Sequence, residues 1–202
     1  MNRDELMQNY WNYYLLLENK FDNMLKYVML KEDNFDTYSY ELSCQLLQIG
    51  SELDVVMKGV CGFGLNERKN IADYCPEIIN LFPLLKSQEV KVIGLENNIK
   101  PYETWDNSKP KELFWWKAYN DVKHARTEHM KKASLKNVVY ALAGLYIMEQ
   151  YWLKNITNIS NEIDFPDKSS EIFSLLNWRT KYTSLKDVFL EQTEEGEVIF
   201  GG

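Results

Sequence analysis

The chain contains few of the residues that mark low-complexity, disulfide-bonded or metal-binding proteins. Its 202 residues include only nine glycines, five prolines and three cysteines, while 45% are hydrophobic. This composition excludes a collagen-like or disordered chain. Cys44, Cys61 and Cys75 are odd in number and contain no C-x-x-C pair, which fits neither a disulfide framework nor a zinc site. We expect reduced thiols in the core, and neither a metal nor another cofactor.

Long apolar segments are also absent. The first apolar run, residues 13–17, is too short for a signal peptide, and the longest, residues 138–148, falls short of the roughly 20 residues that span a bilayer. We therefore expect a soluble cytoplasmic protein that does not enter a membrane. The length suits a single domain over residues 1–202, with a core over about 3–153 and a less regular extension over about 155–202.

The spacing of apolar residues is helical along most of the chain. It predicts helices over about 3–30, 37–60, 70–82, 111–130 and 135–153, with Ser134 opening the last and Gly62 following the second. Between them, residues 89–94 alternate polar and apolar and are followed by Asn97-Asn98-Ile99, which favours a small hairpin. The predicted fold is an all-α, up-and-down bundle of four to five main helices with a small β-hairpin insertion.

Positive charge is concentrated on one helix of an acidic protein. The formal net charge is −7, so the surface as a whole repels polyanions. Residues 117–136 nevertheless carry six lysines and arginines against two carboxylates, and both histidines of the chain, His124 and His129, lie there. A local patch of this sign attracts phosphate.

Two interpretations of this basic segment stay open. In the first, Lys123, Arg126, Lys131 and Lys132 simply neutralise the carbonyls and dipole at a helix C-terminus. In the second, Lys123 and Arg126 bind a phosphate beside Asn120 while a histidine transfers protons, which allows RNA cleavage without a metal. Because His124 and Arg126 lie about 160° apart on a regular helix, their joint action requires a kinked helix end or a second copy of the protein.

A second group of polar residues lies on the helix predicted over 37–60. Asp54 and Lys58 are four residues apart, which suits a surface ion pair. Alternatively, Glu52, Asp54 or Lys58 extends toward Lys123 and Arg126 and fixes their side chains. Nearby aromatic residues could stack on bases, but a stripe of this kind is more typical of a core, where we place them. They are Tyr102, Trp105, Trp115, Trp116 and Tyr119.

The segments 51–58 and 115–126 together resemble small bacterial proteins related to the HEPN superfamily, over roughly residues 38–153. The resemblance implies a helical bundle that dimerises through the helices bearing the polar motif, and roles in toxin–antitoxin and antiviral systems. Many members are metal-independent ribonucleases whose usual signature is an arginine followed four to six residues later by histidine. In this chain Arg126 precedes His129 with two residues between them, and His124 comes before the arginine.

Three functional hypotheses follow, the third of which is a sensor that binds a small-molecule nucleotide. The first is a homodimeric protein that binds RNA or nucleotide phosphate through Asn120, Lys123, Lys131 and Lys132 and cleaves RNA with His124, Arg126 and His129. The second is a non-catalytic subunit of a defence or toxin–antitoxin complex, whose acidic surface meets a basic protein partner.

Overall fold

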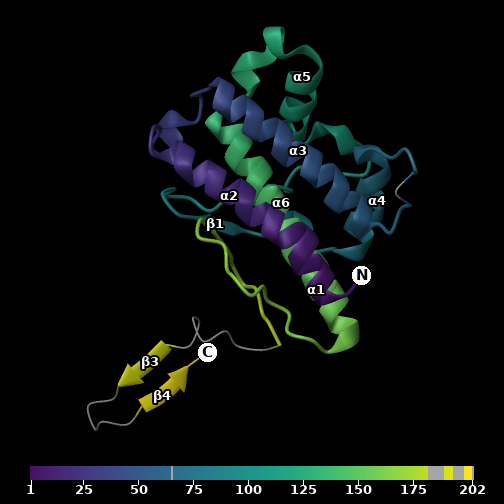
Figure 1. Ribbon diagram of the computed structural model, residues 1–202, viewed down its shortest axis with the longest axis vertical. Coiled ribbons are helices and arrows are strands. Elements are labelled where there is room, and N and C mark those ends of the chain that lie inside the picture. The colour runs from purple at the N-terminus through teal and green to yellow at the C-terminus, as the bar shows by residue number, and fades with distance from the viewer. Residues whose placement is uncertain (65, 182–188, 193–197, 202) are drawn as a thin grey trace.

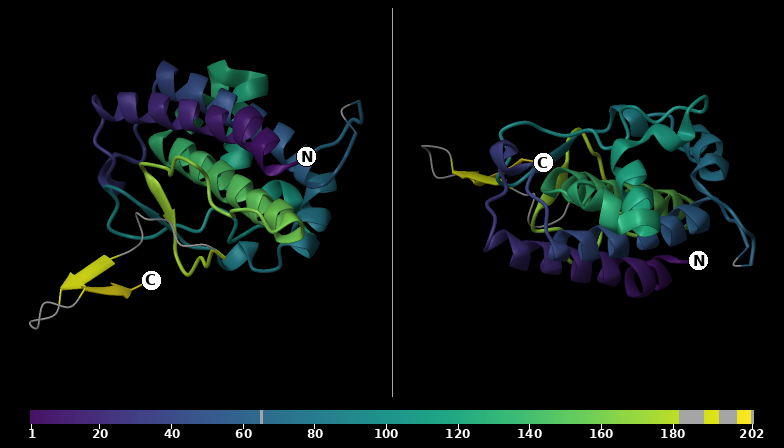
Figure 2. Two further views of the ribbon diagram at one scale, coloured as in Figure 1. Left: turned by 60° about the horizontal axis from the view of Figure 1, so that its bottom comes forward. Right: turned by 90° about the horizontal axis from the view of Figure 1, so that it is seen from above.

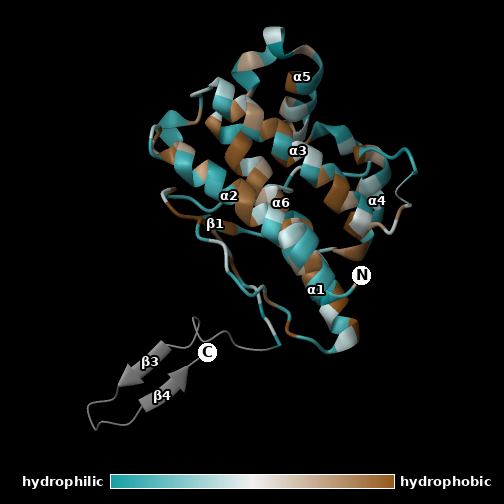
Figure 3. Cartoon of the chain, viewed as in Figure 1, coloured by the Kyte–Doolittle hydropathy of each residue, from teal (hydrophilic) through white to brown (hydrophobic). Residues whose placement is uncertain are grey.

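The computed structural model describes residues 1–64, 66–181, 189–192 and 198–201. Within these residues the chain folds into a bundle of five helices with two small antiparallel sheets, which confirms the predicted all-α architecture. In the views of Figure 2, α6 lies between the layer formed by α2 and α3 and the chain that leads from α4 to α5. Figure 3 shows hydrophobic residues gathered where α2, α3 and α6 face one another.

The N-terminal helix is continuous but changes its winding. α1 (Arg3–Leu6) passes through one π-helical segment (Met7–Trp11) into α2 (Asn12–Leu25). A capping box between Asn2 and Glu5 begins it, because each side chain accepts the other's backbone N–H. The helix ends five residues before the predicted limit, and Leu30 turns into the core instead.

Helices α3 (Tyr40–Val60) and α4 (Ile71–Leu81) begin at polar caps. The hydroxyl of Ser39 accepts the Leu42 N–H at 3.1 Å, and Asn70 caps α4 together with Asp73. The predicted stripe of α3 is buried along its full length, and Gly62 ends the helix region with a φ of +69°. This stripe consists of Leu42, Leu46, Ile49, Leu53, Val56, Met57 and Val60.

The two C-terminal helices meet at a sharp turn (Figure 1). α5 (Phe114–His129) follows a 3-10 turn at Pro110–Glu112 and leads through a second one, Met130–Lys132, into α6 (Leu135–Ser160). Ser134 caps α6 as predicted, and the helix extends seven residues beyond the expected Leu153. Its middle, residues 141–153, is buried on every face, so α6 forms the centre of the core.

Short strands bring the chain after α6 back onto the bundle. β1 (Val90–Val92) pairs antiparallel with β2 (Phe173–Leu175), and Val90 also exchanges two backbone hydrogen bonds of 2.9 Å with Ile99. The hairpin predicted over residues 89–99 is therefore closed by a single bridge, while the main partner of β1 lies more than 80 residues away in the sequence. β3 (Phe189–Gln192) and β4 (Val198–Gly201) pair antiparallel in a separate two-stranded sheet.

Buried Glu18 joins this returning segment to the N-terminal helix. Its carboxylate accepts the Tyr14 hydroxyl at 2.6 Å, the Glu171 backbone N–H at 3.0 Å and the hydroxyl of Ser170. Arg3 similarly donates to the carbonyls of Ile163 and Phe165, both at 3.0 Å. Hydrogen bonds thus anchor the extension, which was expected to be less regular, to the bundle as far as β2.

Helix α3 approaches α5 closely only because residue 50 is a glycine. A methyl group built at Gly50 would lie 2.3 Å from the ring of Tyr119, a buried side chain of α5. We expect Gly50→Ala to lower the free energy of unfolding by about 1–3 kcal/mol through overpacking. Urea denaturation measures this change, with Ser51→Ala on the exposed side of the same helix turn as the control. An unchanged midpoint in Gly50→Ala would contradict this packing.

Candidate phosphate-binding cleft

Helix α5 divides into a buried and a polar side, as its sequence predicts. Trp115, Ala118 and Val122 are buried against neighbouring helices. Asn120 is half-buried and Lys123 is exposed. The aromatic residues predicted to belong to the core are confirmed there, since all five are at most 5% exposed. They leave no open ring face of the kind on which bases stack.

A cleft of about 500 Å³ opens along the polar side of α5. Its walls come from α3, the start of α4, the 3-10 turn before α5, and α5 itself. We call it the lysine cleft. Its lining residues are Asp54, Lys69, Asn70, Ile71, Lys111, Glu112, Trp116, Lys117, Tyr119, Asn120 and Lys123. Two predicted binding residues, Asn120 and Lys123, and one predicted neighbour, Asp54, therefore meet in one cleft.

Positive charge dominates the lysine cleft. It holds four lysines against the carboxylates of Asp54 and Glu112. Asp54 accepts a hydrogen bond of 3.2 Å from the buried Tyr74 hydroxyl. Within the part of the chain that the structure describes, Lys111 and Lys117 form no ion pair. Both ammonium groups are therefore available to an anion.

The other two lysines are held in place by local contacts. Lys123 Nζ donates to the Tyr119 hydroxyl at 3.1 Å and lies 5.2 Å from the centre of the same ring. Lys69 Nζ lies 4.3 Å from the Phe63 ring and 3.5 Å from a carboxylate oxygen of Glu67. Oriented ammonium groups lose less side-chain entropy when a phosphate binds.

The N-terminus of α4 faces the same cleft through Asn70 and Ile71. The helix dipole places partial positive charge there, which favours an anion. Asp73 already accepts the Asn70 backbone N–H at 2.8 Å and so offsets part of this charge. The dipole supplements the lysines rather than forming a site alone.

The predicted catalytic residues lie outside the lysine cleft. Backbone dihedrals at Ala125 (φ −145°, ψ 57°) break α5 between His124 and Arg126. Both of those side chains are exposed, whereas His129 is partly buried. The kinked helix end that a joint role of His124 and Arg126 requires is therefore present.

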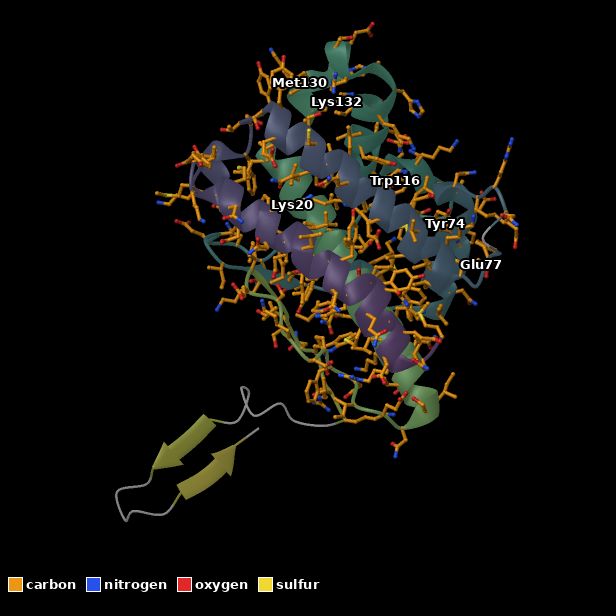
Figure 4. All side chains as sticks on the ribbon, in the orientation of Figure 1. Lys20, Tyr74, Glu77, Trp116, Met130 and Lys132 are labelled. Atoms are coloured by element: carbon orange, nitrogen blue, oxygen red, sulfur yellow. The ribbon has the colours of Figure 1, made fainter. Side chains whose placement is uncertain are left out.

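Lys131 and Lys132 follow this break and face different surroundings. Lys131 is exposed, whereas Lys132 forms an ion pair with Asp121. The hydrogen bond from Lys132 lowers the pKa of the Asp121 carboxyl, and the charges of His129 and Lys117 add to the effect. Figure 4 shows Lys132 and Met130 at the kinked end of α5, and Trp116 and Tyr74 farther along the bundle. The basic residues of the segment 117–136 thus lie partly in the lysine cleft and partly at the kinked end of α5.

Glu52 and Lys58 also lie apart from the cleft lining. Lys58 Nζ donates to the backbone carbonyl of Glu67 at 2.5 Å. Glu52 is half-buried near Glu149 of α6, and burial raises the pKa of Glu52 to about 7. Glu149 is fully buried, and neither of its carboxylate oxygens has a hydrogen-bond partner among the described residues. Burial and the charge of Glu52 therefore raise the Glu149 pKa well above its usual range.

Comparisons with protein-family models, curated proteins and solved structures found no match for this chain. In the described residues, no group of three or more histidine, cysteine, aspartate or glutamate side chains is placed to hold a metal ion. None of the helices there is both long enough and apolar enough to cross a bilayer. The geometry of the lysine cleft is therefore the basis for inferring what this site binds.

Sequence reasoning did not assign three of the four cleft lysines to the site. Lys69 lies in the loop before α4, far from the basic segment in the sequence, Lys111 lies in the 3-10 turn six residues before that segment, and Lys117 is its first residue. The only sequence signals were a lysine directly before the cap residue Asn70 and another after Pro110. Neither signal shows that the start of α4 lies beside α5.

The buried carboxyl of Glu149 should make stability depend on pH. A folded-state pKa above the unfolded value means that the native protein binds the extra proton, so the stabilisation is complete below about pH 4.3 and is lost as pH rises through the folded value. We expect the free energy of unfolding to fall by up to about 1.4 kcal/mol per pH unit over that range. Urea denaturation between pH 5 and pH 8 measures this slope.

Glu149→Gln, which keeps the shape of the neutral acid, should flatten that slope. The exposed Glu96→Gln is the matched control and should keep it. Equal pH slopes in the wild type and Glu149→Gln would show that this carboxyl does not titrate with a raised pKa.

Proposed function

We propose that the lysine cleft binds the phosphate groups of RNA. The observation that carries the proposal is the convergence of four lysines from three segments of an acidic chain in one cleft of about 500 Å³. A protein of net charge −7 gains affinity for a polyanion only where cations are concentrated. The start of α4 adds to the same potential.

The break in α5 supports a catalytic form of this proposal. His124 and Arg126 stand on opposite sides of Ala125, at the end of the helix that also carries Asn120 and Lys123. Neutral histidine accepts a proton from a ribose 2′-hydroxyl near pH 7, and arginine stabilises the charge that develops on the phosphate. This chemistry needs no metal, and it agrees with the resemblance to HEPN ribonucleases. In a homodimer, two such patches could adjoin and raise the local potential.

Substitution of the two unpaired cleft lysines tests RNA binding. We expect the double variant Lys111→Ala/Lys117→Ala to bind labelled single-stranded RNA about tenfold or more weakly. Each lysine–phosphate contact that is lost means that fewer counterions are released from the RNA on binding, and this release favours the complex. The salt dependence of binding should also become shallower, by about one unit of log–log slope for each lost contact.

The matched control is Lys26→Ala/Lys91→Ala, which removes two exposed lysines outside the cleft lining. If both double variants lose the same affinity, net charge rather than the cleft determines binding. If the wild type binds no RNA at low salt, the proposal fails and an interaction with a protein partner becomes the better hypothesis.

Cleavage of labelled RNA in the presence of a chelator tests the catalytic form. We expect His124→Ala and Arg126→Ala each to lower the cleavage rate about 100-fold or more, as removal of a general base or a charge-stabilising group does. Both side chains are exposed, so the fold should survive either change. Lys26→Ala, also on the surface, serves as control. Unchanged cleavage in both variants would exclude these two residues from the mechanism.

A further inference from the structure

A second hollow lies at the C-terminal ends of α4 and α6, and none of its lining residues belongs to the lysine cleft. Its volume is about 370 Å³, within the range of small-molecule sites. We call it the aromatic groove. Its lining residues are Leu81, Phe82, Pro83, Leu84, Gln88, Tyr151, Lys154, Asn155, Asn158, Asn177, Trp178 and Arg179.

Three rings in contact form one wall of the aromatic groove. Tyr151 packs edge to face against Phe82, with ring centres 5.1 Å apart, and lies 4.8 Å from Trp178 on its other side. Phe82 directly follows α4, Tyr151 lies in α6 and Trp178 follows β2, so the wall exists only in the folded chain. Phe82 and Tyr151 are each 8% exposed and Trp178 is half-buried, so the parts of these rings that reach the groove offer aromatic contact to a ligand without an open ring face.

The wall is rigid before any ligand binds. The Tyr151 hydroxyl donates to the Gln88 side-chain oxygen at 3.0 Å, and the Gln88 amide donates to the carbonyls of Glu89 and Leu176, both at 2.9 Å. These bonds fix Tyr151 and Gln88 in one arrangement. A preformed site loses less conformational entropy on binding.

The charged residues of the aromatic groove have one sign. Lys154 and Arg179 line it, and no aspartate or glutamate is among its lining residues. Lys154 Nζ lies 4.1 Å from the centre of a Trp178 ring and donates to the Arg179 carbonyl at 2.6 Å. The Arg179 side chain is exposed and forms no ion pair within the described part of the chain. Its guanidinium is therefore free to pair with a carboxylate or a phosphate.

An unsatisfied donor lies in the same wall. The indole N–H of Trp178 is buried without an acceptor in the described structure. Such a group costs about 1–3 kcal/mol, and native proteins contain few of them. The N–H itself is inaccessible, so it is not one of the groups that a ligand in the groove contacts directly.

We propose that the aromatic groove binds a small planar aromatic anion, which contacts the Phe82–Tyr151–Trp178 wall with its ring and pairs with Arg179 and Lys154 through its negative group. Nucleotides and aromatic carboxylic acids share this chemistry. The site is independent of the lysine cleft and goes beyond the proposed binding of RNA.

Binding of defined probes to the purified full chain tests the proposal. Isothermal titration and ligand-observed NMR would compare AMP and indole-3-acetate, which have a ring and an anion, with adenosine, which lacks the anion, and with inorganic phosphate, which lacks the ring. We expect at least one of the two aromatic anions to bind about tenfold or more tightly than adenosine and phosphate, because the charge-assisted hydrogen bonds to Arg179 and Lys154 add to ring contact. Binding of AMP alone identifies a nucleotide site, and binding of indole-3-acetate alone identifies a carboxylate site.

Variants of the protein then show whether the probe binds in the aromatic groove or in the lysine cleft. Arg179→Ala changes an exposed side chain and should weaken binding about tenfold or more, whereas Lys111→Ala/Lys117→Ala in the lysine cleft should leave it unchanged. Full affinity in Arg179→Ala, loss of affinity in the lysine-cleft variant, or no binding of either aromatic anion at millimolar concentration would each overturn the proposal. Because RNA binding responds to the opposite set of variants, failure of one proposal does not imply failure of the other.

Discussion

The contact of Tyr119 with Gly50 fixes the distance between α3 and α5, and the lysine cleft depends on that distance. The ring occupies the space where any other residue at position 50 would place its Cβ atom. The Tyr119 hydroxyl also accepts a hydrogen bond from Lys123, whose ammonium group lies 5.2 Å from the centre of the ring. One aromatic side chain thus belongs both to the core and to the wall of the cleft. Packing and charge placement are therefore coupled in this protein.

The two buried glutamates, Glu18 and Glu149, differ in whether their carboxyl groups receive hydrogen bonds. Glu18 is surrounded by donors from Tyr14, Ser170 and the backbone of Glu171, so its burial connects the N-terminal helix to the returning chain. Glu149 receives no hydrogen bond from the described residues and lies near another carboxyl. A buried carboxyl without donors is stable only when protonated. Glu18 therefore connects two parts of the tertiary structure, whereas Glu149 makes the free energy of unfolding depend on pH.

The basic residues of this small bundle lie in two separate places. Lysines gather beside the start of α4, while His124 and Arg126 occupy a kinked helix end and Lys132 is neutralised by Asp121. Unpaired ammonium groups favour binding of an anion, whereas the backbone break at Ala125 separates His124 from Arg126. Of the four cleft lysines, only Lys117 and Lys123 lie on α5 with His124 and Arg126, whereas Lys69 precedes α4 and Lys111 lies in the 3-10 turn before α5.

The helices, the cap at Ser134 and the buried face of α3 follow from the sequence alone, because local hydrogen bonds and a period of 3.6 residues specify them. The sequence also located the concentration of positive charge on α5. Three arrangements emerge only in the folded chain: Lys69 and Lys111 join Lys123 in one cleft, Glu52 lies near Glu149, and β1 pairs with a strand more than 80 residues away. These arrangements depend on which helix faces pack together, and periodicity shows that a face is buried without showing what it is buried against.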